Sequence, residues 1–212
     1  MADTKTRILD TALALFNEQG TAPVTTNHVA EALSISPGNL YYHYRNKAEI
    51  VRGLFNRITA AWAANYAIPA DTLPDLALVE RMVAGNFAIQ AQYRFFFRDL
   101  TLLLNADPEL AAAYRQNREA GIANTRALIG LFESVGVLVP LADDEARDDL
   151  AQLLWLVGDF WLVFRDTGGT PFAPSDTAQG VRLFRRLITP HLKGVSTCPL
   201  ELQSTCVRPA SC

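Results

Sequence analysis

Cysteine is missing from the first 197 residues of this 212-residue chain. Its three cysteines, Cys198, Cys206 and Cys212, all lie within the last 15 residues. A body without cysteine needs no disulfide framework, and the spacing of the three thiols matches no structural zinc pattern. Residues 194–212 also show no hydrophobic periodicity, so we predict a flexible tail there.

Histidine is scarce as well. His28, His43 and His191 stand apart from one another, so no pair has the i, i+4 spacing of a helical metal site. The chain has no nucleophile elbow, no P-loop and no dinucleotide-binding glycine fingerprint. We therefore predict a protein that is not an enzyme and holds neither metal nor cofactor, and we keep a helical enzyme as the alternative of another class.

Long apolar runs are also absent. The longest apolar stretch, residues 150–164, is interrupted by Gln152 and Asp159 and is shorter than the roughly 20 residues that a bilayer requires. Residues 1–7 are polar, so we expect no signal peptide. These absences predict a cytoplasmic protein with no membrane association.

What the chain does contain is helical periodicity. Apolar residues recur at helical spacing over residues 6–19, and Gly20 follows as a stop. No alternating strand pattern of useful length is present, so we predict an all-α fold. Past the N-terminal 66 residues, we expect helices over residues 75–92, 95–104, 108–135, 143–165 and 175–192.

Residues 25–47 are the most informative segment, because they predict two short helices around a tight turn. Val29, Ala30 and Leu33 have the spacing of one buried helical face. Ser36 and Pro37 are typical of the cap and first position of a following helix. A helix-turn-helix of this kind places the start of its second helix in the major groove of DNA.

The run I-S-P-G-N-L-Y-Y-H-Y-R-N-K within this segment resembles the DNA-binding signature of tetracycline-repressor (TetR) family regulators. The resemblance covers about the first 60 residues, a three-helix head and the start of the next helix. It implies operator contacts by Thr25, Thr26, Ser36, Pro37, Gly38, Asn39, Tyr41, Tyr42, His43 and Lys47.

Two positions depart from the family pattern. Tyr44 stands where Phe is usual, and Pro37 stands where a polar or basic residue often reads a base. We therefore expect base specificity to depend on Asn39, Tyr41 and Tyr42. The first 60 residues hold six basic and five acidic side chains, so few ion pairs with phosphate are available and affinity should rely on dimerisation and neutral donors.

The rest of the chain is expected to form a body that binds an effector and dimerises. We divide the chain into a helix-turn-helix head (1–46), a linking helix (47–66), the body (67–193) and the tail (194–212). Residues 93–100 and those that follow also resemble the effector domain of one TetR subgroup. The helices predicted over 143–165 and 175–192 are our expected dimer interface, packed with their symmetry mates as a four-helix bundle.

Aromatic residues are abundant in the body, and charged residues stand among them. Arg98, Asp99 and Asp159 fall in apolar surroundings, where an unpaired charge is costly, so each must reach solvent, find a partner or meet an effector. A solvated or interface salt bridge is the simpler interpretation. For a ligand pocket we predict Trp62, Phe87, Phe95, Arg98, Trp155 and Asp159.

Together these observations predict a homodimeric, sequence-specific regulator that represses from a palindromic operator and is released by a small-molecule effector. Two heads about 34 Å apart can read both halves of a palindrome, whereas one head reads only a few base pairs. Two alternatives stay open for control of the same DNA-binding unit: a protein partner, or the thiols of the tail.

Overall fold

The computed structural model describes residues 3–69, 72–169 and 173–194. Over these residues the chain forms ten α-helices, one 3-10 helix and a single isolated β-bridge between Leu138 and Leu192. The predicted all-α fold is confirmed. No helix in these ranges has the length and hydropathy needed to cross a bilayer. Apart from Gly194, the tail predicted over 194–212 lies outside the described residues.

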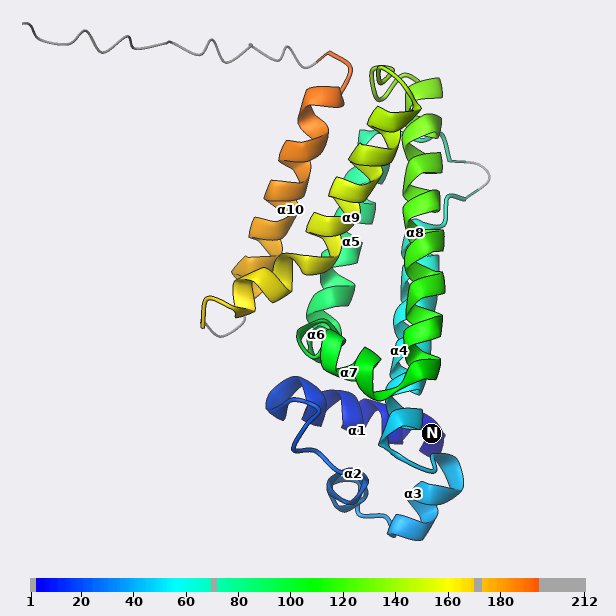
Figure 1. The fold of residues 1–212 in the computed structure, drawn as a ribbon, viewed down its shortest axis with the longest axis vertical. Coiled ribbons are helices and arrows are strands. Elements are labelled where there is room, and N and C mark those ends of the chain that lie inside the picture. The colour runs from blue at the N-terminus through cyan, green and yellow to red at the C-terminus, as the bar shows by residue number, and fades with distance from the viewer. Residues whose placement is uncertain (1–2, 70–71, 170–172, 195–212) are drawn as a thin grey trace, which may run out of the picture.

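The molecule consists of a small head at one end of an elongated helical bundle (Figure 1). The head contains α1 (Thr4–Gln19), α2 (Thr26–Ala32) and α3 (Pro37–His43). From the head, α4 (Lys47–Tyr66) runs into the bundle, which also contains α5 (Leu76–Gln92), α8 (Pro108–Ser134), α9 (Asp144–Asp166) and α10 (Pro174–Ile188). Two short helices, α6 (Arg94–Arg98) and α7 (Leu100–Ala106), lie between the head and the bundle.

The helix starts in the head agree with the sequence patterns. Ser36 Oγ accepts a hydrogen bond from the backbone N–H of Asn39 at 3.2 Å, and Pro37 occupies the first turn of α3. This cap fixes the rotation of α3, so that Leu40 is fully buried while Tyr42 is 85% exposed. Gly20 ends α1 with a φ of 86°, a conformation that costs glycine little.

One predicted helix was wrong: residues 95–104 form two helices rather than one. The break falls at Asp99, whose side-chain Oδ2 accepts hydrogen bonds from Thr21 N at 2.8 Å and from Thr21 Oγ1 at 2.7 Å. These bonds reach 78 residues along the chain, so no local pattern could indicate them. The helix predicted to end at residue 192 also stops early, at Ile188, and the chain continues as a 3-10 turn containing Pro190.

The head and the lower part of the bundle share one hydrophobic core. Phe95, Phe96 and Phe97 of α6 are all buried at its centre. Phe95 packs against Phe16 of α1 with ring centroids 5.3 Å apart, and Phe96 stacks on Phe55 of α4 at 5.2 Å. Because its apolar side chains are shared with both parts, α6 links the position of the head to the packing of the bundle.

Candidate functional site

Helix α3 lies at the end of the molecule farthest from the bundle (Figure 1), and its exposed side chains are polar and aromatic. Asn39, Tyr41 and Tyr42 are exposed there, and Gly38 is exposed beside them with no side chain to cover the backbone. The Tyr41 and Thr26 hydroxyls are 3.1 Å apart, a hydrogen bond that ties α3 to the start of α2. This surface can offer hydroxyl and amide groups to a partner without disturbing the core.

The ten residues implied by the resemblance lie along α2, the turn, α3 and the start of α4. Seven are exposed: Thr25, Ser36, Pro37, Gly38, Asn39, Tyr41 and Tyr42. Thr26, His43 and Lys47 are partly buried. Thr25 also caps α2, because its Oγ1 accepts a hydrogen bond from the His28 N–H at 3.2 Å.

Lys47 is held inside the head. Its Nζ lies 2.7 Å from the carbonyl oxygen of Thr21, 3.0 Å from that of Val24 and 3.4 Å from that of Ala22. An ammonium group has three N–H donors, and these three carbonyls can accept all of them. Lys47 therefore fixes the loop between α1 and α2, the loop that positions the start of the helix-turn-helix.

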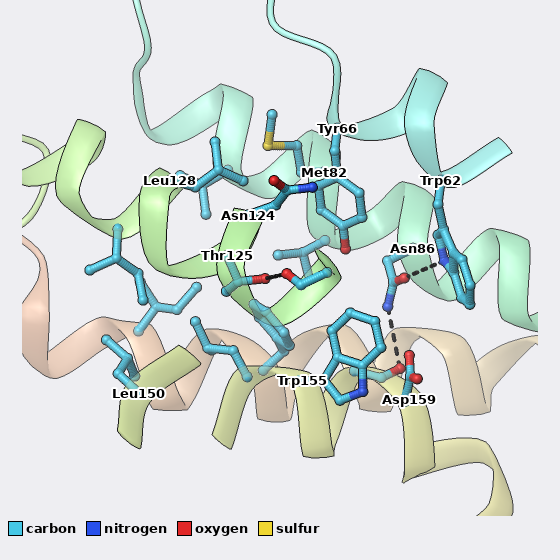
Figure 2. Close-up of a pocket in the computed structure, with 18 of the residues that line it drawn as sticks. Trp62, Tyr66, Met82, Asn86, Asn124, Thr125, Leu128, Leu150, Trp155 and Asp159 are labelled. Carbon is cyan, nitrogen blue, oxygen red and sulfur yellow. Dashed lines mark hydrogen bonds between the residues drawn. The ribbon is translucent and has the colours of Figure 1, made fainter. Parts of the chain in front are cut away.

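The second site is a cavity of about 240 Å³ lined mainly by α4, α5, α8, α9 and α10 (Figure 2). Leu128 and Leu150 lie at one end of the view, whereas Trp62, Asn86 and Asp159 lie at the other. The lining residues are Thr59, Trp62, Ala63, Tyr66, Val79, Met82, Val83, Asn86, Asn117, Ala120, Gly121, Asn124, Thr125, Leu128, Ile129, Phe132, Leu138, Leu150, Leu154, Trp155, Gly158, Asp159, Phe184 and Ile188. A mostly apolar hollow with a few polar groups is typical of a small-molecule site.

The polar end of the cavity combines satisfied and unsatisfied groups. Asn86 accepts a hydrogen bond from Trp62 Nε1 at 3.0 Å and donates one to the Gly158 carbonyl at 3.3 Å. Asp159 is only 5% exposed, and its Oδ2 makes no hydrogen bond with any described residue. The buried Trp155 Nε1 is likewise without a partner in the described part of the chain. An acceptor and a donor are thus left open on successive turns of α9.

The buried position of Asp159 changes the acid–base properties of its surroundings. Burial raises the pKa of the Asp159 carboxyl to about 7, although the Tyr114 hydroxyl and the positive charge of Arg118 act in the opposite direction. The Tyr114 hydroxyl lies close enough to influence Asp159 but makes no hydrogen bond of good geometry. Burial of Tyr114, together with the negative charge of Asp159, raises the pKa of its hydroxyl above the ordinary tyrosine range.

Three of the six residues predicted for a pocket line this cavity, namely Trp62, Trp155 and Asp159. The other three lie elsewhere. Phe87 is fully buried and packs edge-to-face with Phe184, and Phe95 is fully buried against Phe16. Arg98 reaches the head, where its Nη2 donates to the Phe16 carbonyl at 2.9 Å.

The sequence-based prediction missed three residues that shape the cavity. Asn86 is a polar side chain among the apolar residues of α5, and that contrast is a signal that could have identified it. Tyr66 ends α4 in an alanine-rich stretch and gave no such signal. Gly121 of α8 matters because a Cβ there would overlap the Trp155 ring, so glycine allows this ring to lie against the helix backbone.

Polar contacts tie α6 and its flanks to the end of α1. Asn17 donates to the Gln92 carbonyl at 2.8 Å and accepts from the Phe95 N–H at 3.0 Å. The bonds of Arg98 to Phe16 and of Asp99 to Thr21 complete what we call the α6–head joint. On the other side of α6, Phe97 packs against the cavity residue Trp62 with ring centroids 6.0 Å apart. The joint therefore lies one side chain away from the cavity.

An apolar stripe runs along the outer face of α9. Its members recur at helical spacing and are exposed by 47%, 55%, 37% and 69%: Leu153, Leu156, Phe160 and Phe164. The opposite face of α9 packs within the bundle through Leu150, Leu154 and Leu162. Water faces this stripe in the single chain, as is typical of a protein-interaction surface.

Comparison with known proteins identifies the parts of this architecture. Residues 8–54 match the family model described as "Bacterial regulatory proteins, tetR family", and residues 59–197 match the model described as "Bacterial transcriptional repressor". The crystal structure of a TetR-family transcriptional regulator from Marinobacter aquaeolei VT8 superposes with a TM-score of 0.82 at 33% identity, covering 91% of this chain and 93% of that one.

Two curated relatives match over 94 residues each. The biofilm operon icaADBC negative transcriptional regulator IcaR of Staphylococcus epidermidis is 33% identical over 94 residues, which is 44% of each protein. The transcriptional repressor KstR2 of Rhodococcus jostii is 32% identical over 94 residues, 42% of this chain and 45% of that protein. The chain thus spans less than half the length of these curated relatives.

Proposed function

The chain belongs to the TetR family of bacterial transcriptional regulators, and we propose that it is a homodimeric repressor that binds a palindromic operator and is released by a small ligand. The observation that carries the proposal is the surface of α3, where Leu40 is fully buried and Tyr42 is 85% exposed. A helix anchored on one face and presenting polar aromatic groups on the other suits entry into the major groove.

In the DNA-bound state, Asn39, Tyr41 and Tyr42 contact base edges, because they are exposed along α3. The hydroxyls of Thr25, Thr26 and Ser36, with the exposed backbone at Pro37 and Gly38 and the ring of His43, contact phosphate and sugar groups. Lys47 acts by holding the loop before α2, since carbonyl oxygens surround its ammonium group.

Dimerisation uses the stripe of α9 together with α10. Leu153, Leu156 and Phe160 project from one face of α9, so a second copy can cover them in a four-helix bundle. Two-fold symmetry then places two heads on the same side of the DNA. Each complex then contains two heads. This explains how a head with few cations available for phosphate reaches useful affinity for DNA.

Release by a ligand follows from the position of the cavity. A molecule that fills the space beside Trp62 changes the packing of Trp62 on Phe97, and α6 transmits the change to the head through the α6–head joint. The ligand shifts the population toward a dimer whose heads are spaced wrongly for the operator. Operator DNA must then weaken ligand binding by the same factor, about 5- to 150-fold for ordinary coupling energies.

Selection of binding sites from random double-stranded DNA tests the proposal. We expect a palindrome whose half-sites lie about one helical turn apart or a multiple of that distance, and a complex containing an even number of protomers. Enrichment of no sequence, or of an asymmetric site bound by one protomer, would contradict it.

A further inference from the structure

We propose that the cavity is built for a compact lipophilic organic cation, with Asp159 as the counter-ion and the surrounding aromatic rings as the walls. The inference rests on the proposed ligand-controlled function and names the chemical class of the ligand. Asp159 is the only acidic or basic side chain among the described residues that line the cavity. A ligand that binds beside this negative group must therefore supply the positive charge.

No Lys or Arg among the described residues forms an ion pair with Asp159, and the charge of Arg118 acts on it only without direct contact. Arg165, six residues farther along α9, forms an ion pair with Asp176 at 2.7 Å. Arg98 is bound to the Phe16 carbonyl, and Arg118 is exposed and forms no ion pair with Asp159 in the described structure. The Tyr114 hydroxyl is the one neutral donor that acts on Asp159, and neither it nor Asp159 Oδ2 makes a hydrogen bond of good geometry in the described structure. A buried carboxyl group in this state is costly unless something else satisfies it.

The walls of the polar end are aromatic. Trp62 and Tyr66 of α4 and Trp155 of α9 line the cavity with Asp159, and Figure 2 shows these side chains converging from opposite sides. The faces of such rings attract ammonium groups, most strongly where water is excluded. An aromatic enclosure with one carboxyl group therefore selects a positive charge over a neutral or negative group of the same size.

The electrostatics favour a ligand whose charge is permanent. Burial raises the pKa of Asp159 to about 7, so the empty cavity holds the carboxyl partly protonated near neutral pH. A bound cation stabilises the ionised carboxylate and displaces that proton to solvent. The buried site is then close to neutral in both states, as the protonated acid without a ligand and as an ion pair with the cation bound.

The size and the far end of the cavity define the rest of the molecule. A volume of about 240 Å³ is smaller than the roughly 300 Å³ at which pockets begin to accept drug-sized ligands. Leu128 and Leu150 make the far end apolar. A single ring or short hydrocarbon attached to an ammonium group fits both the volume and the polarity.

A matched pair of probes tests the inference on the full chain. Benzyltrimethylammonium and neopentylbenzene have nearly the same shape, but the first has a charged nitrogen where the second has carbon. Calorimetric titration near pH 8 should show the cation binding tighter by about tenfold or more. In the Asp159→Asn variant the cation should lose this advantage, while the affinity of the neutral probe changes little.

Asp149→Asn is the matched control, because Asp149 lies exposed on the same helix outside the cavity. This variant should keep the preference for the cation. Equal affinities of the two probes for the unmodified protein, a preference that survives Asp159→Asn, or failure of the cation to bind at millimolar concentration would each overturn the inference. Selection of an operator without any ligand tests the proposed function separately, so the two failures can be told apart.

Discussion

Asp159 is a single side chain that reduces the stability of the folded protein as the pH rises. Its pKa is raised from 3.8 to about 7, so between these values the folded chain binds more protons than the unfolded chain. The free energy of unfolding must therefore fall as pH increases from about 4 to about 7. A buried carboxyl that costs stability and is nevertheless present in a cavity is typical of a functional site.

Replacement of Asp159 by Asn should remove this pH-dependent decrease in the free energy of unfolding. The variant should match the unmodified protein below about pH 4 and exceed it above pH 7, by at most on the order of 4 kcal/mol. Urea denaturation at several pH values measures the difference. A difference that stays constant with pH would mean that Asp159 is ionised to the same extent in the folded and unfolded chains.

Leu40 and Tyr42 are near neighbours on α3 with opposite environments. Leu40→Ala should destabilise the protein by about 2 to 5 kcal/mol, because it removes a fully buried side chain. Tyr42→Ala should leave the melting temperature nearly unchanged, since the side chain is 85% exposed. Thermal melts of both variants check which face of α3 packs on the core. If Tyr42→Ala were the less stable variant, the assigned rotation of α3 would be wrong.

These environments could be predicted from the sequence because they depend on helical periodicity and local caps. The role of Arg98 could not. Arg98 pairs with neighbouring Asp99 at 3.2 Å and donates to the carbonyl of Phe16, which lies 82 residues away. A charged residue in an apolar stretch is equally compatible with a pocket. Only the fold distinguishes a residue that makes a structural contact from one that lines a pocket, and the same applies to Phe87 and Phe95.

Helix α6 is the element on which communication between cavity and head depends. Its three consecutive phenylalanines are buried in the shared core, and Asp99 at its end accepts two hydrogen bonds from Thr21. The sequence predicted helical structure here but not its interruption, because the bonds that stabilise the break come from a loop in the head. Long-range contacts of this kind leave no mark on local patterns.

Replacement of Asp99 by Ala tests the strength of the α6–head joint. Its carboxylate is largely buried and accepts bonds from a backbone N–H and a hydroxyl, so its loss should cost about 1 to 3 kcal/mol. Asp10→Ala is the control, because Asp10 pairs with Arg57 on the surface, where such pairs contribute about 1 kcal/mol or less. Chemical denaturation should separate the two variants, and equal losses would argue against the joint.

At the scale of the whole molecule, the single chain leaves its outer apolar stripe on α9 uncovered. The sequence indicated helices 143–165 and 175–192 as an interface, because amphipathic helices near the end of a helical chain suit a four-helix bundle. The order of the helices could be predicted from breaks and periodicity. The cavity could not, since its walls come from five helices that meet only in the folded state.

Leu156→Glu should break the proposed dimer, because it places a charge in the middle of the stripe. Leu102 on α7 is the matched control, since both leucines are 55% exposed and only one belongs to the stripe. Sedimentation analysis should find the Leu156→Glu variant shifted to monomer and the Leu102→Glu variant still dimeric. If both remain dimeric, the interface lies elsewhere on the surface.

An equilibrium titration of labelled operator with the unmodified protein and with Tyr42→Ala decides whether α3 reads operator DNA. The operator would come from selection on random DNA, and fluorescence anisotropy would report binding. We predict that Tyr42→Ala raises the dissociation constant by about tenfold or more, as expected when a specific contact is lost, while the variant remains folded and dimeric. Unchanged affinity of a folded, dimeric Tyr42→Ala protein would contradict the assignment of α3 as the DNA-reading helix.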